Sequence, residues 1–186
     1  PDYIVESVLT DGEAWVALQT HVVSGTSTAT ITFTSSTGAN DWSQYIDLVL
    51  IGHAAGEAVG GTNSSYINFN NDTTSSYNAQ FVYGDGASVY GLAATYDKLY
   101  IDAAPGTASP QPWGISLTNI YDINSGKSKT AISQLAGDRS GAGMVGVYTT
   151  TWQKQSAITE IDIACGFDFL PDTRFDLFGV LPRMVS

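Results

Sequence analysis

Oxygen-bearing side chains cluster at one place in this 186-residue sequence, where Asn70, Asn71 and Asp72 are consecutive and Thr73 follows them. Carboxylate and carboxamide oxygens are the ligands that Ca²⁺ prefers, so the segment could supply part of a calcium site. The alternative is a polar turn, because Asn and Asp side chains accept hydrogen bonds from the backbone two residues further on. We favour the turn, and we assign no metal ligand, cofactor-binding residue or cofactor to the chain.

Three further carboxylates, Asp168, Asp172 and Asp176, recur at every fourth residue. On a helix this spacing would place them on one face. Pro171 and the alternating pattern around it contradict a helix, so we interpret the spacing as accidental. Glycoside hydrolysis needs two carboxylates at a set separation across a groove, and a sequence alone does not show such a separation.

Nucleophilic catalysis also lacks its usual sequence signals. His21 and His53 are the sole histidines, and the sequence contains no G-x-S-x-G elbow, P-loop or G-x-G-x-x-G segment. Cys165 is the single cysteine and lies on the apolar side of an alternating segment, where we expect a buried, inert thiol. We therefore expect no catalytic residues, and the sequence predicts a protein that is not an enzyme.

Aromatic side chains on loops or strand edges could stack on sugars. The candidates are Trp42, Tyr77, Tyr90 and Trp113. Aromatic residues also dominate protein cores and protein–protein interfaces, and that explanation fits most of them better.

The segment from residue 144 to residue 181 indicates the fold most directly, because apolar and polar residues alternate along it. Such a period of two is typical of strands in a sheet with one buried face. We expect five of its residues to belong to the core: Trp152, Ile158, Ile161, Phe175 and Leu177.

Other segments repeat this pattern between turn-forming residues. Residues 28–36 alternate clearly, 45–51 form a nearly continuous apolar run, and 113–123 can form a hairpin with 127–135. A short helix is the weaker expectation for Tyr90–Tyr96. The pattern predicts an all-β protein, an antiparallel β-sandwich of jelly-roll type with about 8–10 strands, and one domain over residues 1–186.

The charge balance disfavours two classes of partner. The chain has 18 acidic and 7 basic residues, a formal net charge of −11. Nucleic-acid binding needs a cationic surface, and anionic membrane surfaces attract cationic ones. The sequence also contains no run of about 18 apolar residues that would span a bilayer. We expect neither nucleic-acid nor membrane partners.

An ordered set of segments resembles a known family. The early strand reads SGTSTATITFTSS and the core strand YIDLVLIG, followed by an N-[GN]-D-x-x-x-x-Y segment at residues 70–77. A hairpin follows, from Leu117-Thr118-Asn119-Ile120-Tyr121 to Lys127 and Lys129, and then W-x-x-x-x-A-I-T-x-I from Trp152 to Ile161. Together these segments resemble the β-sandwich domains of tailed-phage virion proteins, which occur as small stand-alone proteins and in tail-fibre modules.

The resemblance covers most of residues 15–181 and ends in a strand of the G-S-x-F-x-L-Y-G-I kind. Here that strand reads Asp172-Thr173-Arg174-Phe175-Asp176-Leu177-Phe178-Gly179-Val180, so Asp-Thr replaces Gly-Ser and Phe replaces Tyr. The signatures are structural, and the family supplies no catalytic residues to transfer.

The resemblance implies a virion structural protein, foremost a capsid decoration or cement protein that stabilises the assembled head. Its partners would be the major capsid protein or tail proteins. A homo-oligomer is expected, and a trimer at a three-fold position would suit the role. Residues 1–11 and 181–186 are the expected interaction arms. The alternative is a tail-fibre or tail-adaptor module that binds host surface glycans.

Overall fold

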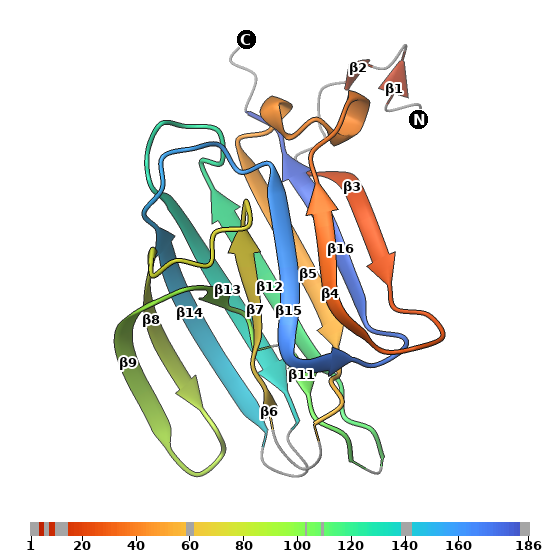
Figure 1. Ribbon diagram of the computed structural model, residues 1–186, viewed down its shortest axis with the longest axis vertical. Helices are drawn as coiled ribbons and strands as arrows, with labels where there is room; N and C mark the ends of the chain where they lie inside the picture. The colour runs from red at the N-terminus through yellow and green to blue at the C-terminus, as the bar shows by residue number, and fades with distance from the viewer. Residues whose placement is uncertain are drawn as a thin grey trace.

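The computed structural model describes residues 15–58, 64–102, 104–108, 110–138 and 143–182, together with the backbone at 4–5, 8–9 and 62–63. Two antiparallel sheets face each other across a shared core (Figure 1). Most of the two expected interaction arms lies outside the described residues.

The large sheet has eight strands, and every neighbouring pair is antiparallel. Their spatial order is β3 (Trp15–Val22), β16 (Arg174–Val180), β5 (Asp47–Ala54), β12 (Gly114–Tyr121), β13 (Lys129–Gly137), β14 (Met144–Trp152), β8 (Tyr77–Gly84) and β9 (Val89–Tyr96). Residues 45–51 thus lead into a central strand, as their continuous apolar run indicates.

The small sheet has four strands in the order β10 (Leu99–Tyr100), β7 (Ser65–Phe69), β15 (Glu160–Phe169) and β4 (Thr28–Thr34). Two further pairs are short: β1 (Ile4–Val5) with β2 (Val8–Leu9), and β6 (Thr62–Asn63) with β11 (Ala104–Pro105). Two 3₁₀ turns, η1 (Gly38–Asn40) and η2 (Trp42–Gln44), precede β5.

The predicted antiparallel all-β sandwich is confirmed. The two main sheets hold twelve of the strands, more than the 8–10 expected, whereas the jelly-roll connectivity stays a prediction. The expected hairpin between residues 113–123 and 127–135 is present as β12 and β13.

The helix expected at Tyr90–Tyr96 is wrong, because these residues form β9. This strand pairs with β8 along its whole length, from Gly84↔Val89 to Tyr77↔Tyr96. The intervening turn sets the register: the Asp85 carboxylate accepts hydrogen bonds from the backbone N–H groups of Ala87 and Ser88. A well-formed hairpin overrides the weak local helix signal.

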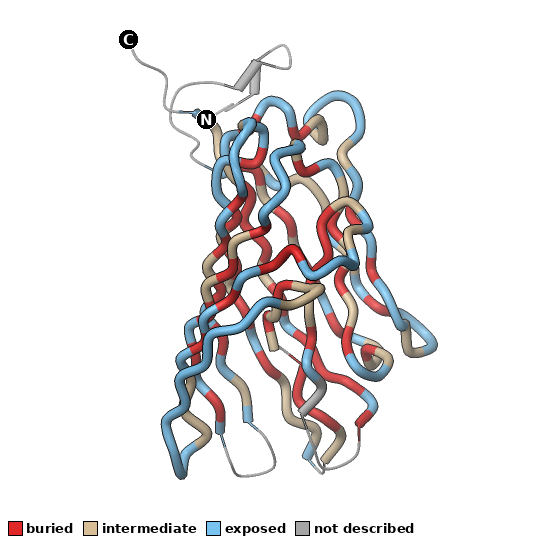
Figure 2. Tube along the Cα trace, turned by 60° about the vertical axis from the view of Figure 1, so that its left-hand side comes forward, coloured by how far each residue is buried: buried red, intermediate tan, exposed pale blue. Residues whose placement is uncertain are grey.

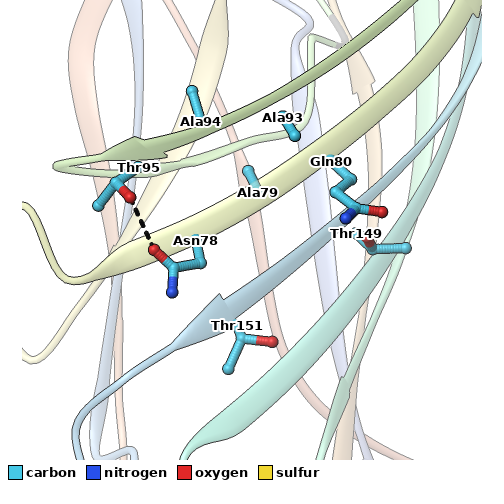
Figure 3. Close-up of a pocket in the computed structure, with 8 residues that line it drawn as sticks. All are labelled: Asn78, Ala79, Gln80, Ala93, Ala94, Thr95, Thr149 and Thr151. Atoms are coloured by element: carbon cyan, nitrogen blue, oxygen red, sulfur yellow. Dashed lines mark hydrogen bonds between the residues drawn. The ribbon is translucent and has the colours of Figure 1, made fainter.

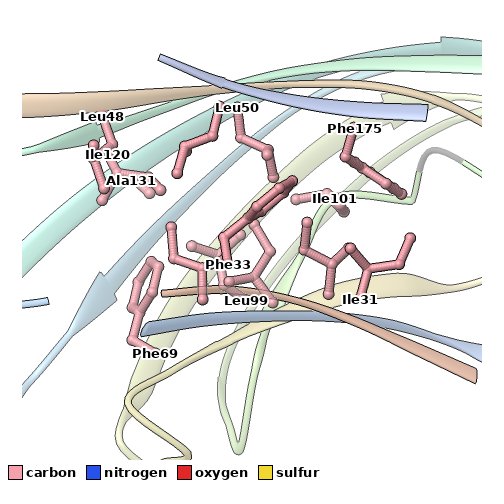
Figure 4. Packing of buried hydrophobic residues seen from close by; sticks show 14 of the residues in the cluster. Ile31, Phe33, Leu48, Leu50, Phe69, Leu99, Ile101, Ile120, Ala131 and Phe175 are labelled. Atoms are coloured by element: carbon pink, nitrogen blue, oxygen red, sulfur yellow. The ribbon is translucent and has the colours of Figure 1, made fainter. Parts of the chain in front are cut away.

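The core lies between the two sheets, and both contribute side chains to it. Figure 4 shows Ile31 and Phe33 from β4 facing Leu48 and Leu50 from β5. Burial of such side chains contributes about 1.5–3 kcal/mol each. The predicted core residues are confirmed, because all five are at most 2% exposed: Trp152, Ile158, Ile161, Phe175 and Leu177.

One core contact depends on a glycine. Tyr45 is buried directly over Gly179 of β16, and its hydroxyl donates a hydrogen bond of 2.7 Å to the Ala39 carbonyl oxygen. A Cβ atom at Gly179 would lie 2.5 Å from the Cγ and Cδ1 atoms of the Tyr45 ring. Only glycine leaves room for this ring.

The small sheet covers only part of the large one. In Figure 1 the β8–β9 hairpin extends beyond the edge of the small sheet. Beneath this overhang a second apolar cluster forms from Ala79, Phe81, Leu135, Met144 and Tyr148. Figure 2 shows the result: buried and exposed residues alternate along most strands, whereas one strand, β9, is exposed along nearly its whole length.

Candidate functional site

Five neighbouring strands of the large sheet, β12, β13, β14, β8 and β9, present an outer face that points away from the small sheet. Burial alternates along β12, β13, β14 and β8, and the pairing register places the exposed positions in cross-strand rows. Twenty residues make up this surface, here named the uncharged face: Ile115, Leu117, Asn119, Tyr121, Thr130, Ile132, Gln134, Ala136, Val145, Val147, Thr149, Thr151, Asn78, Gln80, Val82, Gly84, Val89, Gly91, Ala93 and Thr95.

The uncharged face contains no Asp, Glu, Lys, Arg or His. Charged residues make up 13% of the chain, so about two or three would be expected among twenty positions. Solvent-facing sides of antiparallel sheets are usually polar, with charged residues among them. On the same side of the sheet, ionisable side chains lie on the next two strands: His53 and Asp47 on β5, and Arg174 and Asp176 on β16.

Several large apolar side chains of this face are open to solvent. Val145 is 65% exposed, Val82 59% and Ile115 54%. Val147 lies directly opposite Val82 across the β14–β8 pair and is 47% exposed. Large apolar patches on folded chains are often interaction sites, so this group makes the face a candidate.

The uncharged face is hollowed where β14, β8 and β9 lie side by side. An open hollow of about 500 Å³ is lined by small or uncharged side chains, among them Asn78, Gln80 and Thr149. Figure 3 shows these side chains and the hydrogen bond of 2.8 Å from Thr95 to Asn78. The hollow contains no charged side chain that could pair with a charged ligand, so its lining is better suited to packing against another protein surface.

The uncharged face ends at an open sheet edge, because β9 is last in the strand order. Its sequence, VYGLAATY, contains no charge and no proline. Charged residues and prolines are the usual protection of an exposed edge, so β9 is also available for strand pairing with another chain.

The segment Asn70–Asp72 forms the turn that we favoured. Asn70 and Asn71 have φ values of 51° and 57°, and the Asp72 N–H donates to the Phe69 carbonyl oxygen, as in a type I′ turn. The Asp72 carboxylate accepts hydrogen bonds from Trp152 Nε1 at 2.7 Å, Ser76 Oγ, Thr74 Oγ1 and Thr74 N. These contacts give the segment a structural role, because they connect the end of β7 to Trp152 of β14.

Asn70 connects the same turn to β15, the neighbour of β7 in the small sheet. Its carboxamide oxygen accepts from the N–H groups of Thr159 and Glu160, and its nitrogen donates to the Ala157 carbonyl oxygen at 2.7 Å. The side chain therefore positions the start of β15. Sequence reasoning identified both segments but not the contact between them.

The other carboxylates named from the sequence do not converge. Asp176 forms an ion pair with Arg174 at 2.9 Å on the outer face of β16, and Asp172 lies in the turn before that strand with a φ of 72°. Asp168 lies on β15 in the small sheet. Across the part of the chain that the structure describes, no group of three His, Cys, Asp or Glu side chains could hold a metal ion.

The histidines and the cysteine lie apart from one another. His21 is on edge strand β3, whereas His53 on β5 stacks on Trp113 with ring centroids 5.0 Å apart. Cys165 is buried, and burial raises the pKa of its thiol to about 11. The thiol is therefore protonated at neutral pH, as expected for an inert cysteine.

The aromatic candidates divide between core and surface. Trp42 and Tyr77 are buried and belong to the core. Tyr90 is 43% exposed and stacks on Tyr83 at 5.0 Å, beside an aromatic cleft under β8 and β9. The sequence named Tyr90 but not this cleft, because the cleft exists only where two strands overhang the small sheet.

Comparison with known proteins adds no relative: no protein-family model, no curated protein and no solved structure matches the chain. Within the described residues, no helix has the length and apolar character needed to cross a membrane.

Proposed function

We propose that the protein is a structural component of a tailed-phage virion, a capsid decoration protein that docks on the assembled shell through the uncharged face. The observation that carries the proposal is the absence of charge from twenty adjoining surface positions on a chain with net charge −11. The resemblance of the ordered sequence segments to virion β-sandwich domains supplies the biological setting.

The size and chemistry of the uncharged face fit a protein partner. Stable interfaces use about 20–30 residues on each side, and their centres are depleted in charged residues. Burying an unpaired charge costs several kcal/mol, and burying this face incurs no such cost because the face contains no charge. Electrostatic repulsion between free copies meanwhile opposes indiscriminate association.

Docking of this kind would stabilise the shell by mass action, because a protein that binds only the assembled state shifts the equilibrium towards it. The expected partner is the major capsid protein, and a homotrimer at a three-fold position of the lattice would suit the arrangement. The open β9 edge supports contact between copies or with the lattice.

A tail-adaptor module that binds host glycans is the second candidate. The observation in its favour is the aromatic cleft beneath β8 and β9. The number of copies in the virion distinguishes the two: decoration requires on the order of hundreds per particle, and a tail module only a handful.

Val147→Lys should reduce binding to shells depleted of the protein by about 100-fold or more, because docking would bury an unpaired ammonium group. Val147 is 47% exposed, so the free protein should keep its stability. Sedimentation of the variant with depleted shells, quantified by gel densitometry, measures the effect.

Val22→Lys is the matched control, because Val22 is 49% exposed and lies on β3 at the opposite end of the same sheet. Its binding should stay within about threefold of the wild type. Equal loss in both variants, or no loss in Val147→Lys, would refute docking through the uncharged face. A handful of copies per purified virion would refute the decoration role itself.

A further inference from the structure

The β8–β9 overhang has a second hollow on its inner side, opposite the uncharged face. This cleft has a volume of about 280 Å³. Six of the residues that line it carry the argument: Phe81, Tyr83, Tyr96, Tyr100, Tyr148 and Asp102.

The aromatic rings of the cleft hold one another in place. Phe81 and Tyr148 are buried at its floor, with ring centroids 4.5 Å apart. Tyr96 stacks on Phe81 at 5.5 Å, and Tyr100 meets the Phe81 ring edge-on at 5.7 Å. Tyr96 and Tyr100 are only half-buried, so part of each ring remains available to a ligand. A ligand would meet aromatic surface that is already ordered, which lowers the entropy cost of binding.

Polar groups lie among these rings. The Tyr148 hydroxyl donates a hydrogen bond of 2.8 Å to Asp102 Oδ2. The Asp102 backbone is held in turn, since its N–H donates to the Ser65 carbonyl oxygen and its φ is 38°. The carboxylate therefore has a defined place on the cleft wall, with Oδ1 buried and Oδ2 bonded to Tyr148, and the tyrosine hydroxyls around it can donate or accept.

We infer that this cleft binds a neutral sugar ring. A pyranose has an apolar C–H face that packs on aromatic rings, and hydroxyls at its rim that hydrogen-bond to carboxylates and phenols. The volume lies just below the range of about 300–1,000 Å³ for small-molecule pockets, which suits one ring rather than a long chain. The Asp102 carboxylate and the net charge of −11 oppose sugar acids and phosphates.

The opposite side of the same two strands lacks this chemistry. The hollow in the uncharged face is lined by Thr, Asn, Gln and Ala and contains no aromatic ring. The hairpin thus separates a surface for protein from a cleft for carbohydrate. Sugar binding in this cleft deepens the second candidate function, the glycan-binding module, but does not depend on docking to a shell, so it and the decoration role can fail separately.

The test is titration of the purified chain with glucose, galactose, mannose and N-acetylglucosamine up to about 20 mM, monitored by NMR chemical shifts, so that a Kd of about 1 mM is measurable. At least one sugar should give saturable shifts. Asp102→Asn keeps the shape of the side chain but removes its charge, and should weaken binding about tenfold or more. Tyr96→Ala removes one aromatic wall and should do the same.

Gln80→Ala is the control, because Gln80 neighbours Phe81 on β8 but points to the hollow on the other side. It should bind as the wild type does, and thermal melting verifies that every variant is folded. Three outcomes would overturn the inference: no neutral sugar binds, binding survives both Asp102→Asn and Tyr96→Ala, or glucuronic acid binds more tightly than glucose.

Discussion

Gly179→Ala should lower the free energy of unfolding by about 3 kcal/mol, at the upper end of the usual cost of overpacking a core. The added methyl group would lie 2.5 Å from two ring carbons of Tyr45, well inside van der Waals contact. The ring cannot simply rotate away, because it is buried and its hydroxyl is bonded to the Ala39 carbonyl oxygen. Urea denaturation followed by tryptophan fluorescence measures the change.

Gly91→Ala provides the matched control for this substitution. Gly91 also lies in a strand, β9, but a Cβ atom there would meet nothing within 4 Å. Its stability should change by less than about 0.5 kcal/mol. In a Tyr45→Ala background the additional cost of Gly179→Ala should largely disappear, since the clash has been removed. A full cost in that background would show that another contact is responsible.

Acid should destabilise the fold through Asp72. Burial of this carboxylate would by itself raise its pKa, but hydrogen bonds from Ser76, Thr74 and Trp152 outweigh it and hold the pKa well below the ordinary value. A carboxylate whose pKa is lowered on folding stabilises the protein above its unfolded pKa of about 4. That contribution is lost as the pH falls towards the folded value, so the Tm should drop steeply below about pH 4.

Asp72→Asn isolates this contribution. The amide nitrogen would face a donor, either on the Thr74 side or at Trp152 Nε1 and Ser76 Oγ, so stability at pH 7 should fall by about 2 kcal/mol. The difference from the wild type should shrink as the pH is lowered to 3, because the carboxylate then binds a proton in the unfolded wild-type chain but stays ionised in the folded one. A difference that is constant from pH 7 to pH 3 would assign the effect to packing alone.

Much of the fold follows from local pattern. Alternation in β15 and β16, and a β-branched and aromatic run in β14, predicted these strands and most of their buried residues, because a strand with one buried face must place apolar side chains at every second position. The strand β9 was missed because both of its faces are exposed, so its sequence carries no alternation. Its structure depends on the Asp85 turn and on pairing with β8, and the sequence of β9 alone indicates neither.

The candidate site was less predictable, for a related reason. The uncharged face is formed by five strands, and what distinguishes it is that none of its residues is charged. This is visible only once the pairing register of the strands is known. The same holds for the cleft, which brings Asp102 beside Tyr148 across 46 residues of sequence. Lys129 shows the converse: its ammonium group donates to the Ser125 and Lys127 carbonyl oxygens, and the residue is buried. The sequence placed Lys129 in this hairpin but did not predict that the residue is buried there.

The position of β16 constrains the order in which the chain can fold. This strand lies between β3 and β5, so the first strand of the large sheet has no neighbour until residues 174–180 are available. Nearly 160 residues separate β3 from its partner, and closing such a distance is entropically slow. During translation the edge of β5 that later pairs with β16 stays unpaired while the later hairpins form. Completion of the sheet is therefore a late event, which exposes apolar strands to association with other nascent chains until it occurs.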